Sequence, residues 1–501
     1  MAETFLTYDL GTTALKTALI SGEGKPLAVY SREYTPRAPR PDWAVLEAKV
    51  YWQAAVEGTR AVLAQSGADP ASIAGIGFSS QGQTFVPLDR HGQPLYDAIV
   101  WLDTRAQDIT DAWEASWLTR DKFQRASGFP WLAANLTVFK IAWFAEHAPA
   151  AHKAWKFLLL PDYLIFRMTG ETATDYVTAR MSGLYDLETG RWDPILMGAA
   201  GVTRDQLPTV LPPGSVAGKV HAAAAKELGI PAGVPVTVGA NDQVVGAVGA
   251  GNVAPGIVTE MTGTALALLA TTPTLLKDRS MIVGKHAVPE FSYGMTLAMT
   301  SAIVLKWFRD LCGAGQNYKE FLNGVEAIPC GCEGLTVIPH FAGTAMPPFN
   351  PRVRGAFIGL SLGHTRTHMA RAILESCVCL LKELLCPIMD KGLTVNSVRS
   401  LGGAARNDLW MQMKADLLGI GVERPACADA ASLGAAMFAA SGTGRFGSIA
   451  EASRAWYRSE RLFEPDPARY ETYREVYERY MDAMRRLYGD ATPASAASVP
   501  A

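Results

Sequence analysis

The sequence lacks the features that mark a membrane protein, a secreted protein or a nucleic-acid-binding protein. No apolar run approaches the roughly 18 residues that a membrane-spanning helix needs. The first residues, MAETFLTYDLG, enter a strand pattern directly and have neither the charged nor the apolar region of a signal peptide. The formal net charge is −2, and charges are spread along the chain without a basic patch or an acidic tail. We therefore expect a cytoplasmic protein with no nucleic-acid and no membrane partner.

Cysteine is scarce, and its spacing does not fit a zinc site. All seven cysteines follow residue 311. The pairs Cys330/Cys332 and Cys377/Cys379 are C-x-C, not the two C-x-x-C knuckles of a structural zinc site. This usage predicts reduced thiols. Cys377 and Cys379 lie in a helical apolar pattern, so we expect them to be buried.

The chain is long and apolar enough for two large domains of the α/β class. It has 501 residues, of which 49% are hydrophobic and 19% charged. The segment FLTYDLGTTALKTALI, residues 5–20, predicts a strand, a glycine turn and a second strand, and LAVYSREY predicts a third. Three strands with short turns make an antiparallel meander. Amphipathic helical patterns and further buried strands follow.

A second hairpin pattern near the middle of the chain repeats the first. VTEMTGTALALLATTP at 258–273 again reads strand, Gly-Thr turn, strand, but lacks the aspartate and the lysine of the first copy. Such an echo is typical of two related domains. We place the boundary between 245 and 255 and predict an N-terminal domain over 1–248 and a C-terminal domain over 249–488. The small, polar residues 489–501 predict a disordered tail.

The first hairpin is a candidate phosphate and metal site. Asp9 ends an apolar strand, where a buried carboxylate without a partner is costly. In the following turn, backbone N–H groups and the hydroxyls of Thr12 and Thr13 can cradle phosphate oxygens, Lys16 can add a cation, and Asp9 can hold Mg²⁺ through water. An ordinary polar turn explains the stretch about as well. Neither a P-loop pattern nor a dinucleotide-binding glycine pattern is present.

Two further strand ends carry candidate functional residues. Asp242 follows the apolar strand VPVTVGA and precedes a helix. This position suits a general base, and it also suits a helix N-cap. Taken alone, the stretch is better explained by capping. Later, Gly402, Gly403 and Ala404 follow a strand and would let a flat ligand approach the backbone, with Asn407 able to bond a ring or a ribose. A β–α turn that needs glycine is a strong alternative.

Taken together, these motifs resemble the FGGY carbohydrate kinase family from end to end, and within it the xylulokinase-like members. DLGTT with Lys16, GANDQ, MTGTA and LGGAARNDLW are similar to the family's first phosphate, catalytic-aspartate, second phosphate and adenosine motifs. The C-terminal signature fits GAFIGLSLGHTRTHMARAILE at every position. The N-terminal signature fits TVFKIAWFAEH around Lys140 and Trp143 but departs from the family at Asn135.

The resemblance implies an α/β fold of two actin-like (ribonuclease H-like) ATPase domains with an interdomain cleft. Sugar would bind in the N-terminal domain and ATP mostly on the C-terminal one. Asp242 would be the catalytic base, and Asp9 together with Asp242 would hold Mg²⁺. Phosphoryl transfer would then depend mainly on positioning and charge stabilisation. The resemblance implies that ATP is bound by Thr12, Thr13, Lys16, Gly263, Thr264, Gly402, Gly403, Ala404 and Asn407.

The substrate is less clearly indicated, because the chain departs from the xylulokinases in the loops that would contact sugar. Gln-Gly-Gln-Thr at 81–84 replaces their Gln-Met-His-Gly, and Leu102 replaces an Asn in the stretch AIVWLDTR. Gln243 resembles glycerol kinases, whereas Thr344-Ala345 replaces the Glu-Arg of xylulokinases. The resemblance implies substrate contacts by Gln81, Gln83, Trp101, Asp103, Arg105 and Gln243. For Arg105, a structural pair with Asp103 is as well supported as a direct contact.

We expect ATP-dependent phosphorylation of a small ketose or polyol, with a pentulose such as xylulose as the leading substrate. Ribulose, erythritol, glycerol and a deoxy-hexulose are alternatives within this class. An actin-like ATPase without a sugar substrate and a sugar-binding regulator that has lost catalysis are alternatives outside it, which the complete set of motifs disfavours. The sequence leaves the oligomeric state open, with a homodimer as one option.

Overall fold

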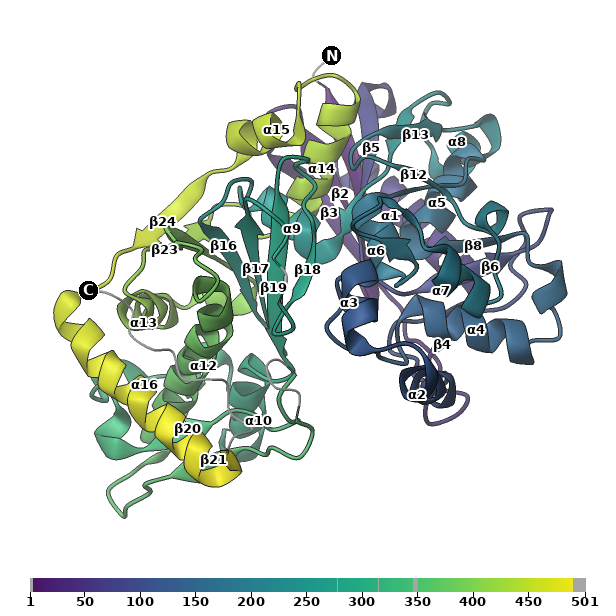
Figure 1. Cartoon of the computed structure of the whole chain (residues 1–501). Helices are drawn as coiled ribbons and strands as arrows, with labels where there is room; N and C mark the ends of the chain where they lie inside the picture. Colours follow the sequence, from purple (N-terminus) through teal and green to yellow (C-terminus); the bar gives the residue numbers. More distant parts are fainter. Residues whose placement is uncertain (1–2, 277, 314, 346–349, 490–501) are drawn as a thin grey trace. The chain divides into compact units, whose positions relative to one another are not determined.

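The computed structural model describes residues 3–276, 278–313, 315–345 and 350–489 (Figure 1). The chain forms two compact units. The first unit consists of Met1–Val253, Val283–Ser292 and Asp429–Tyr457, and the second of Ala254–Ile282, Tyr293–Ala428 and Arg458–Ala501. The segment predicted as a disordered tail, 489–501, lies outside the described residues except for Gly489. Each unit contains a seven-stranded sheet and helices, as the α/β class requires.

The main sheet of the first unit is built on the predicted meander. Strands β1 (Thr4–Leu10), β2 (Ala14–Ser21) and β3 (Pro26–Glu33) are antiparallel neighbours, which confirms the reading of the first hairpin. Strand β5 (Ile73–Ser80) lies parallel to β1 on its other side, so β1 is central in the sheet. The order is β13-β14-β5-β1-β2-β3, with β15 also paired to β5, and the remaining strands are β13 (Val216–Lys219), β14 (Pro235–Thr237) and β15 (Ala240–Asn241).

Helices cover this sheet and supply much of the core of the first unit. Helix α1 (Ala48–Ser66) buries Tyr51, Trp52 and Val62 in the same cluster as Leu6 and Leu19 of the sheet. Helices α9 (Asp242–Gly249) and α14 (Ala430–Gly442) are rich in alanine and glycine and pack closely, as Figure 1 shows for the pair. A Cβ on Gly434 would lie 2.1 Å from the carbonyl oxygen of Val245, so only glycine permits this approach.

A smaller four-stranded sheet is formed by β4 and by three strands that lie between β5 and α5 in the sequence. Its order is β4-β7-β6-β8, and its strands pair antiparallel. The elements of this part and the rest of the first unit are β4 (Val45–Leu46), β6 (Phe85–Leu88), β7 (Ala98–Ile99), α2 (Gln107–Ser116), α3 (Arg120–Ser127), α4 (Thr137–His147), β8 (Lys156–Leu159), α5 (Leu160–Thr169), β9 (Ala173–Asp175), α6 (Tyr176–Met181), β10 (Tyr185–Asp186), β11 (Arg191–Trp192), α7 (Pro194–Ala199), β12 (Thr209–Leu211), α8 (Ala222–Leu228) and α15 (Ile449–Trp456).

The second unit repeats the arrangement around its own hairpin. Strands β16 (Ile257–Thr262) and β17 (Leu266–Thr272) are antiparallel, and β22 (Ser397–Leu401) lies parallel to β16, as β5 does to β1. The predicted echo of the first hairpin is therefore a real repeat of topology. The seven-stranded sheet runs β18-β19-β17-β16-β22-β23-β24, with β18 (Ile282–Lys285), β19 (Ser292–Ala298), β23 (Val422–Pro425) and β24 (Ser459–Phe463). The chain passes from the second unit to the first within β18, after Ile282.

The long helix α12 (Arg366–Met389) is central to the core of the second unit. Cys377 and Cys379 are buried on it, as predicted, and no disulfide joins the seven cysteines, all of which lie in the described ranges. The other elements of this unit are α10 (Ala302–Cys312), α11 (Tyr318–Phe321), β20 (Thr336–Ile338), β21 (Ala356–Ile358), α13 (Asp408–Leu418) and α16 (Pro467–Tyr488). Among the helices in the described ranges, none combines the length and the apolar character needed to span a bilayer.

Candidate active site

Asp9 lies at the end of β1 between two polar neighbours. In the sheet register it is opposite Lys16 on β2 and opposite Ser79 on β5. Ser79 Oγ donates a hydrogen bond of 2.7 Å to Asp9 Oδ1. Burial raises the pKa of Asp9, and the charge of Asp429 raises it further, while the Ser79 bond and Lys16 act in the opposite direction. The carboxylate is thus held in a partly desolvated site, not simply solvated at a turn.

The turn after Asp9 is tied to two distant loops. Gly11 N donates to Ala14 O at 2.9 Å and closes the turn, while Gly11 O accepts from Gln81 Nε2 at 3.1 Å. Thr12 Oγ1 accepts a hydrogen bond of 2.7 Å from Trp101 Nε1. These contacts bring the predicted phosphate hairpin together with Gln81 and Trp101, two of the predicted substrate residues.

The other hydrophilic groups of this hairpin differ in their exposure. Thr13 is exposed, and its carbonyl oxygen accepts from Tyr34 N. Lys16 Nζ lies 3.3 Å from Asp429 Oδ2, and both side chains are partly exposed. Asp429 begins the segment that returns to the first unit late in the sequence. A ligand phosphate near Lys16 would therefore compete with this ion pair.

Asp242 lies at the same edge of the sheet as Asp9. Strand β15 is parallel to β5, with Ala240 opposite Ser79 and Asn241 opposite Ser80, and β5 is parallel to β1 with Ser79 opposite Asp9. The carboxyl ends of β1, β5 and β15 therefore meet, and Asp242 is the first residue after β15.

The alternative that Asp242 caps the helix is not what the structure shows. Asn241 is the N-cap of α9, because its Oδ1 accepts from Gln243 N at 3.2 Å. Asp242 is the first helical residue, and its Oδ1 accepts from the same N–H at 2.8 Å. The cap is thus provided by the neighbour, and the Asp242 carboxylate is not needed for that purpose.

The electrostatics of Asp242 suit a general base. Burial raises the pKa of Asp242 to about 7, and the charge of Asp9 is the second cause. The two carboxylates are therefore coupled within one site. A base works best when its pKa lies near the operating pH, and here the value falls in the neutral range.

The carboxylates of Asp9 and Asp242 suit a cation that prefers oxygen ligands and needs few of them from the protein. Within the described ranges, no group of three or more His, Cys, Asp or Glu side chains is arranged to hold a metal ion. Asp9 and Asp242 offer carboxylate oxygens at one sheet edge, and a nearby cation would offset the repulsion that raises the pKa of Asp242. One or two carboxylates, completed by water and phosphate, are typical of Mg²⁺ sites.

A buried lysine that we did not predict as a site residue joins the two substrate loops. Lys140 on α4 is fully buried, and its Nζ donates to Gln83 O at 2.9 Å and to Val100 O at 3.0 Å. Thr137 Oγ1, on the same helix, also donates to Gln83 O, at 3.0 Å. Gln83 has φ of 62°, a left-handed conformation that is strained for a residue with a side chain. In the sequence, only the N-terminal family signature around Lys140 pointed to this lysine.

Asp103 and Arg105 form a buried pair. Arg105 Nε and Nη2 each donate to Asp103 at 2.7 Å, and Ala44 N donates to Asp103 Oδ2 at 2.6 Å. The guanidinium carbon of Arg105 lies 3.7 Å from the centre of the Trp43 ring, and both charged side chains are fully inaccessible. The structure favours the structural alternative for this pair, and a direct sugar contact stays a prediction.

In the second unit, the predicted nucleotide motifs lie at one edge of the sheet. Met261 is opposite Leu401 in the parallel pair of β16 and β22, so the Gly263 turn and the Gly402 turn follow neighbouring strand ends. Gly402, Gly403 and Thr264 are exposed. Gly402 has φ of 81°, which favours glycine, and a Cβ on Gly403 would meet nothing within 4 Å. Backbone at this edge is accessible to a ligand.

The other residues of these motifs also have structural roles in the second unit. Ala404 is buried. Asn407 is the N-cap of α13 and accepts from Trp410 N at 2.9 Å. Ser301 N and Ala302 N donate to the carbonyl oxygens of Thr264 and Gly263, which fixes the hairpin turn against the start of α10.

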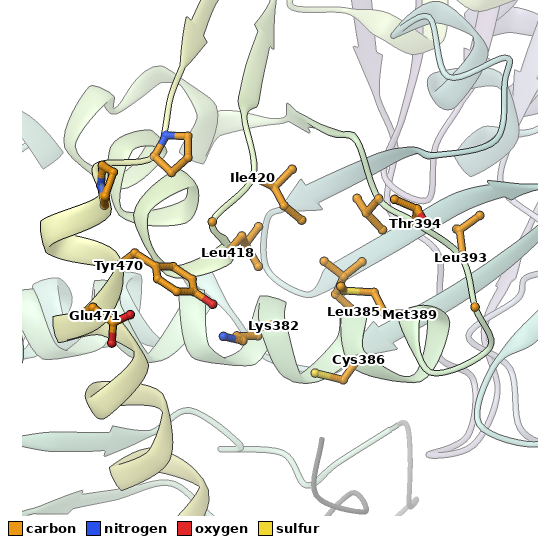
Figure 2. Close-up of a pocket in the computed structure, with 15 residues that line it drawn as sticks. Lys382, Leu385, Cys386, Met389, Leu393, Thr394, Leu418, Ile420, Tyr470 and Glu471 are labelled. Carbon is orange, nitrogen blue, oxygen red and sulfur yellow. The ribbon is translucent and has the colours of Figure 1, made fainter. Parts of the chain in front are cut away.

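A cavity of about 670 Å³ in the second unit is separate from these motifs. Figure 2 shows Lys382, Leu385, Cys386 and Met389 on one helix, α12, with Tyr470 of α16 beside them. The cavity adjoins the loop that precedes β22, whereas the Gly402 turn follows that strand. None of the predicted site residues lines it.

Comparison with known proteins agrees with this geometry along the chain. The N-terminal domain of the FGGY family of carbohydrate kinases matches residues 4–249, and the C-terminal domain of the same family matches 259–443. The xylulose kinase of Bacillus subtilis is 30% identical over 479 residues, which cover 94% of this chain and 95% of the relative. The glycerol kinase of Nitratidesulfovibrio vulgaris (strain Miyazaki F) is 32% identical over 481 residues, covering 93% and 95%.

A solved structure supports the fold. The ligand-bound xylulose kinase from Lactobacillus acidophilus superposes with a TM-score of 0.90 at 23% identity and covers 98% of this chain and 99% of its own. This likeness confirms the predicted α/β fold of two actin-like ATPase domains. Because sugar kinases take their phosphoryl group from ATP, the comparisons also support ATP as a substrate. The chain belongs to the FGGY family of carbohydrate kinases.

Proposed function

We propose that this kinase phosphorylates a hydroxyl group of a small ketose or polyol, with a pentulose such as xylulose as its substrate, and that Asp242 is the catalytic base. The observation that carries the proposal is the position of Asp242 after β15, beside Asp9, with a pKa raised to about 7. A carboxylate in this state can accept the proton of the attacking hydroxyl near neutral pH.

The residues around Asp242 would position the sugar. Gln243 follows it on α9, and Gln81 and Trp101 contact the turn after Asp9. Gln83 is held in place by Lys140. We assign direct sugar contacts to Gln81, Gln83, Trp101 and Gln243, and we propose that Asp103 and Arg105 support the loop that carries Trp101.

We propose that Asp9 and Asp242 hold Mg²⁺. The fit rests on two coupled carboxylates at one strand edge, each with a raised pKa, which a cation would stabilise in their charged forms. When bound, Mg²⁺ would neutralise charge on the phosphates during transfer. Asp242 would meanwhile orient the hydroxyl and take its proton, and the Ser79 bond would keep Asp9 in place.

For the nucleotide, we propose phosphate contacts from both hairpins and adenosine contacts from the Gly402 turn. The support is the accessible backbone of the second unit and the hydroxyls of the first hairpin. The assignment is phosphates to Thr12, Thr13, Lys16, Gly263 and Thr264, and adenosine to Gly402, Gly403, Ala404 and Asn407. We propose the sugar-binding and catalytic role for the domain predicted over 1–248 and the ATP-binding role for the domain predicted over 249–488, of which Val283–Ser292 and Asp429–Tyr457 belong to the first compact unit. A homodimer is a further prediction, which light scattering would test.

A polyol such as glycerol is the second candidate substrate. It is favoured by the glycerol kinase relative, which is 32% identical, and by Gln243, which resembles that group of kinases. An assay of ADP release over a panel of ketoses and polyols distinguishes the two. We expect one pentulose to stimulate ADP release most strongly, and a preference for glycerol would contradict the choice of xylulose. ATP turnover that no panel member changes would refute the whole assignment.

The role of Asp242 has its own test. Asp242→Ala should abolish phosphoryl transfer while nucleotide binding stays close to that of the parent. Near-parental turnover by this variant would show that another group is the base.

A further inference from the structure

The second unit contains a closed polar network that no part of the proposed mechanism uses. Glu260 on β16, Thr262 on the same strand, Ser400 on β22 and Lys414 on α13 are all buried, with at most 2% of each residue exposed. Glu260 Oε2 accepts from Thr262 Oγ1 at 2.6 Å, and Oε1 accepts from Ser400 Oγ and from Lys414 Nζ. Lys414 Nζ also donates to Ser400 Oγ at 2.9 Å and to Thr262 Oγ1 at 3.2 Å.

This network is complete in its hydrogen bonding. The three hydrogens of the Lys414 ammonium have three acceptors, and each hydroxyl donates to Glu260 while it accepts from Lys414. A buried ion pair of this kind is weak evidence for added stability, since desolvation opposes the attraction of the charges and apolar replacements often serve as well. A fully satisfied network can instead fix the relative positions of the elements that it joins.

The elements joined here are those that carry the predicted nucleotide motifs. Thr262 is the last residue of β16 and immediately precedes Gly263. Ser400, which lies opposite Glu260 in the parallel pair, is two residues before Gly402. Lys414 is on α13, the helix that begins directly after the N-cap Asn407. The network therefore lies next to both exposed turns and includes a residue of the helix that follows the second of them.

We propose that Glu260 and Lys414 are positioning residues of the nucleotide site, which set the distance between the Gly263 turn and the Gly402 turn. The proposal rests on the proposed function, which assigns ATP to these turns. The two residues do not contact ATP in this account. They act through Thr262 and Ser400, whose backbone leads directly into the turns.

A second buried ion pair in the same unit provides a matched control. Arg371 and Glu375 on α12 are 2.9 Å apart, and Glu375 also accepts from Gly331 N, while Arg371 donates to Tyr473 OH. These contacts involve neither of the two turns. Loss of this pair should destabilise the unit in a similar way without moving the nucleotide motifs.

The test compares Glu260→Gln/Lys414→Met with Arg371→Met/Glu375→Gln. Unfolding temperature, the Kd of ADP by calorimetry without sugar, and separate KM values for ATP and sugar are measured for both. We expect similar losses of unfolding temperature, but a Kd of ADP and a KM for ATP raised about tenfold or more only in the first variant, because small misplacements of binding groups are costly. The KM for sugar should stay within about twofold in both.

Three outcomes separate the possibilities. If the two double variants lose stability equally and both bind ADP as the parent does, the network is merely structural and the proposal is overturned. If the first double variant does not fold, Thr262→Val, which removes one hydroxyl at constant shape, decides the matter: weaker ADP binding supports the proposal and parental binding overturns it. If the parent itself does not bind ADP, the proposed function fails, not the positioning role alone.

Discussion

Replacing Asp242 with asparagine should abolish phosphoryl transfer and, at the same time, stabilise the folded protein at alkaline pH. The parent carries a carboxylate whose pKa is raised to about 7 by burial and by the charge of Asp9, compared with an ordinary value of 3.8. Protonation therefore favours the folded state. The stability that the proton contributes is fully present below pH 3.8 and is lost as the pH rises through 7. An amide cannot ionise, so the variant avoids this loss.

The magnitude follows from the size of the shift. Two pKa values that differ by about 3 units correspond to ~4 kcal/mol at pH 8, at about 1.4 kcal/mol for each unit. Asp242 is half-buried as a residue, so solvent screening reduces this to about 1–2 kcal/mol. At 2–4 °C for each kcal/mol, the unfolding temperature at pH 8 should rise by about 2–8 °C. At pH 5 the rise in unfolding temperature should be less than about half of its value at pH 8, because Asp242 of the folded parent is then mostly protonated.

The assay is thermal unfolding of the ligand-free protein in EDTA between pH 5 and pH 8, together with sugar-dependent ADP release. EDTA is needed because a bound cation would favour the charged carboxylate. Asp193→Asn is the control, because Asp193 caps α7 at Ile195 N and Leu196 N and asparagine caps equally well. The control should match the parent in both measurements. If the Asp242→Asn protein is no more stable than the parent at pH 8, burial does not raise the pKa of Asp242 in the way described. If the variant retains turnover, Asp242 is not the catalytic base.

Three further changes test other parts of the site. In the parent, kcat/KM for sugar should fall on acidification at a pH below about 7, because bound Mg²⁺ favours the charged Asp242 carboxylate. Asp9→Asn should shift the pH of this fall, because it removes both a charge that raises the pKa of Asp242 and a carboxylate proposed to hold Mg²⁺, and an unshifted pH profile would contradict their coupling. Lys140→Met should raise the KM for sugar about tenfold or more but leave the KM for ATP within about twofold, since it frees the Gln83 loop, and equal changes in both would indicate a general loss of structure. Arg105→Met should lower the free energy of unfolding, measured with urea, by about 3–5 kcal/mol, because it leaves the Asp103 carboxylate buried without its ion-pair partner. An unchanged free energy of unfolding would show that the pair is not buried in solution.

The sequence predicted those features that depend on neighbouring residues. A glycine turn between two apolar strands, as in DLGTT and MTGTA, is fixed by local backbone geometry, and both hairpins are present as predicted. The meander and the buried thiols of Cys377 and Cys379 follow from apolar patterning in the same way, whereas the parallel strand beside each hairpin was seen only in the structure. Family membership could also be inferred, because its motifs are short and contiguous.

Other questions depended on contacts between residues far apart in the sequence. The pairing of Asp103 with Arg105 could not be distinguished from a sugar contact until Trp43 and the Ala44 N–H were placed against them. The return of Asp429 to the first unit, where it pairs with Lys16, had no local signal. The same is true of Lys414 and Glu260, which are 154 residues apart in the sequence.

What the sequence by itself determined was which groups lie at the strand ends: Asp9 near the end of β1, Asp242 directly after β15, and glycine directly after β16 and β22. Only the tertiary structure decided what those groups can do. The parallel pairing of β1, β5 and β15 brings the two carboxylates to one edge. Burial and mutual repulsion there raise the pKa of Asp242 to about 7. A pKa depends on the dielectric surroundings and the charges within a few ångströms, and these are properties of the packed chain.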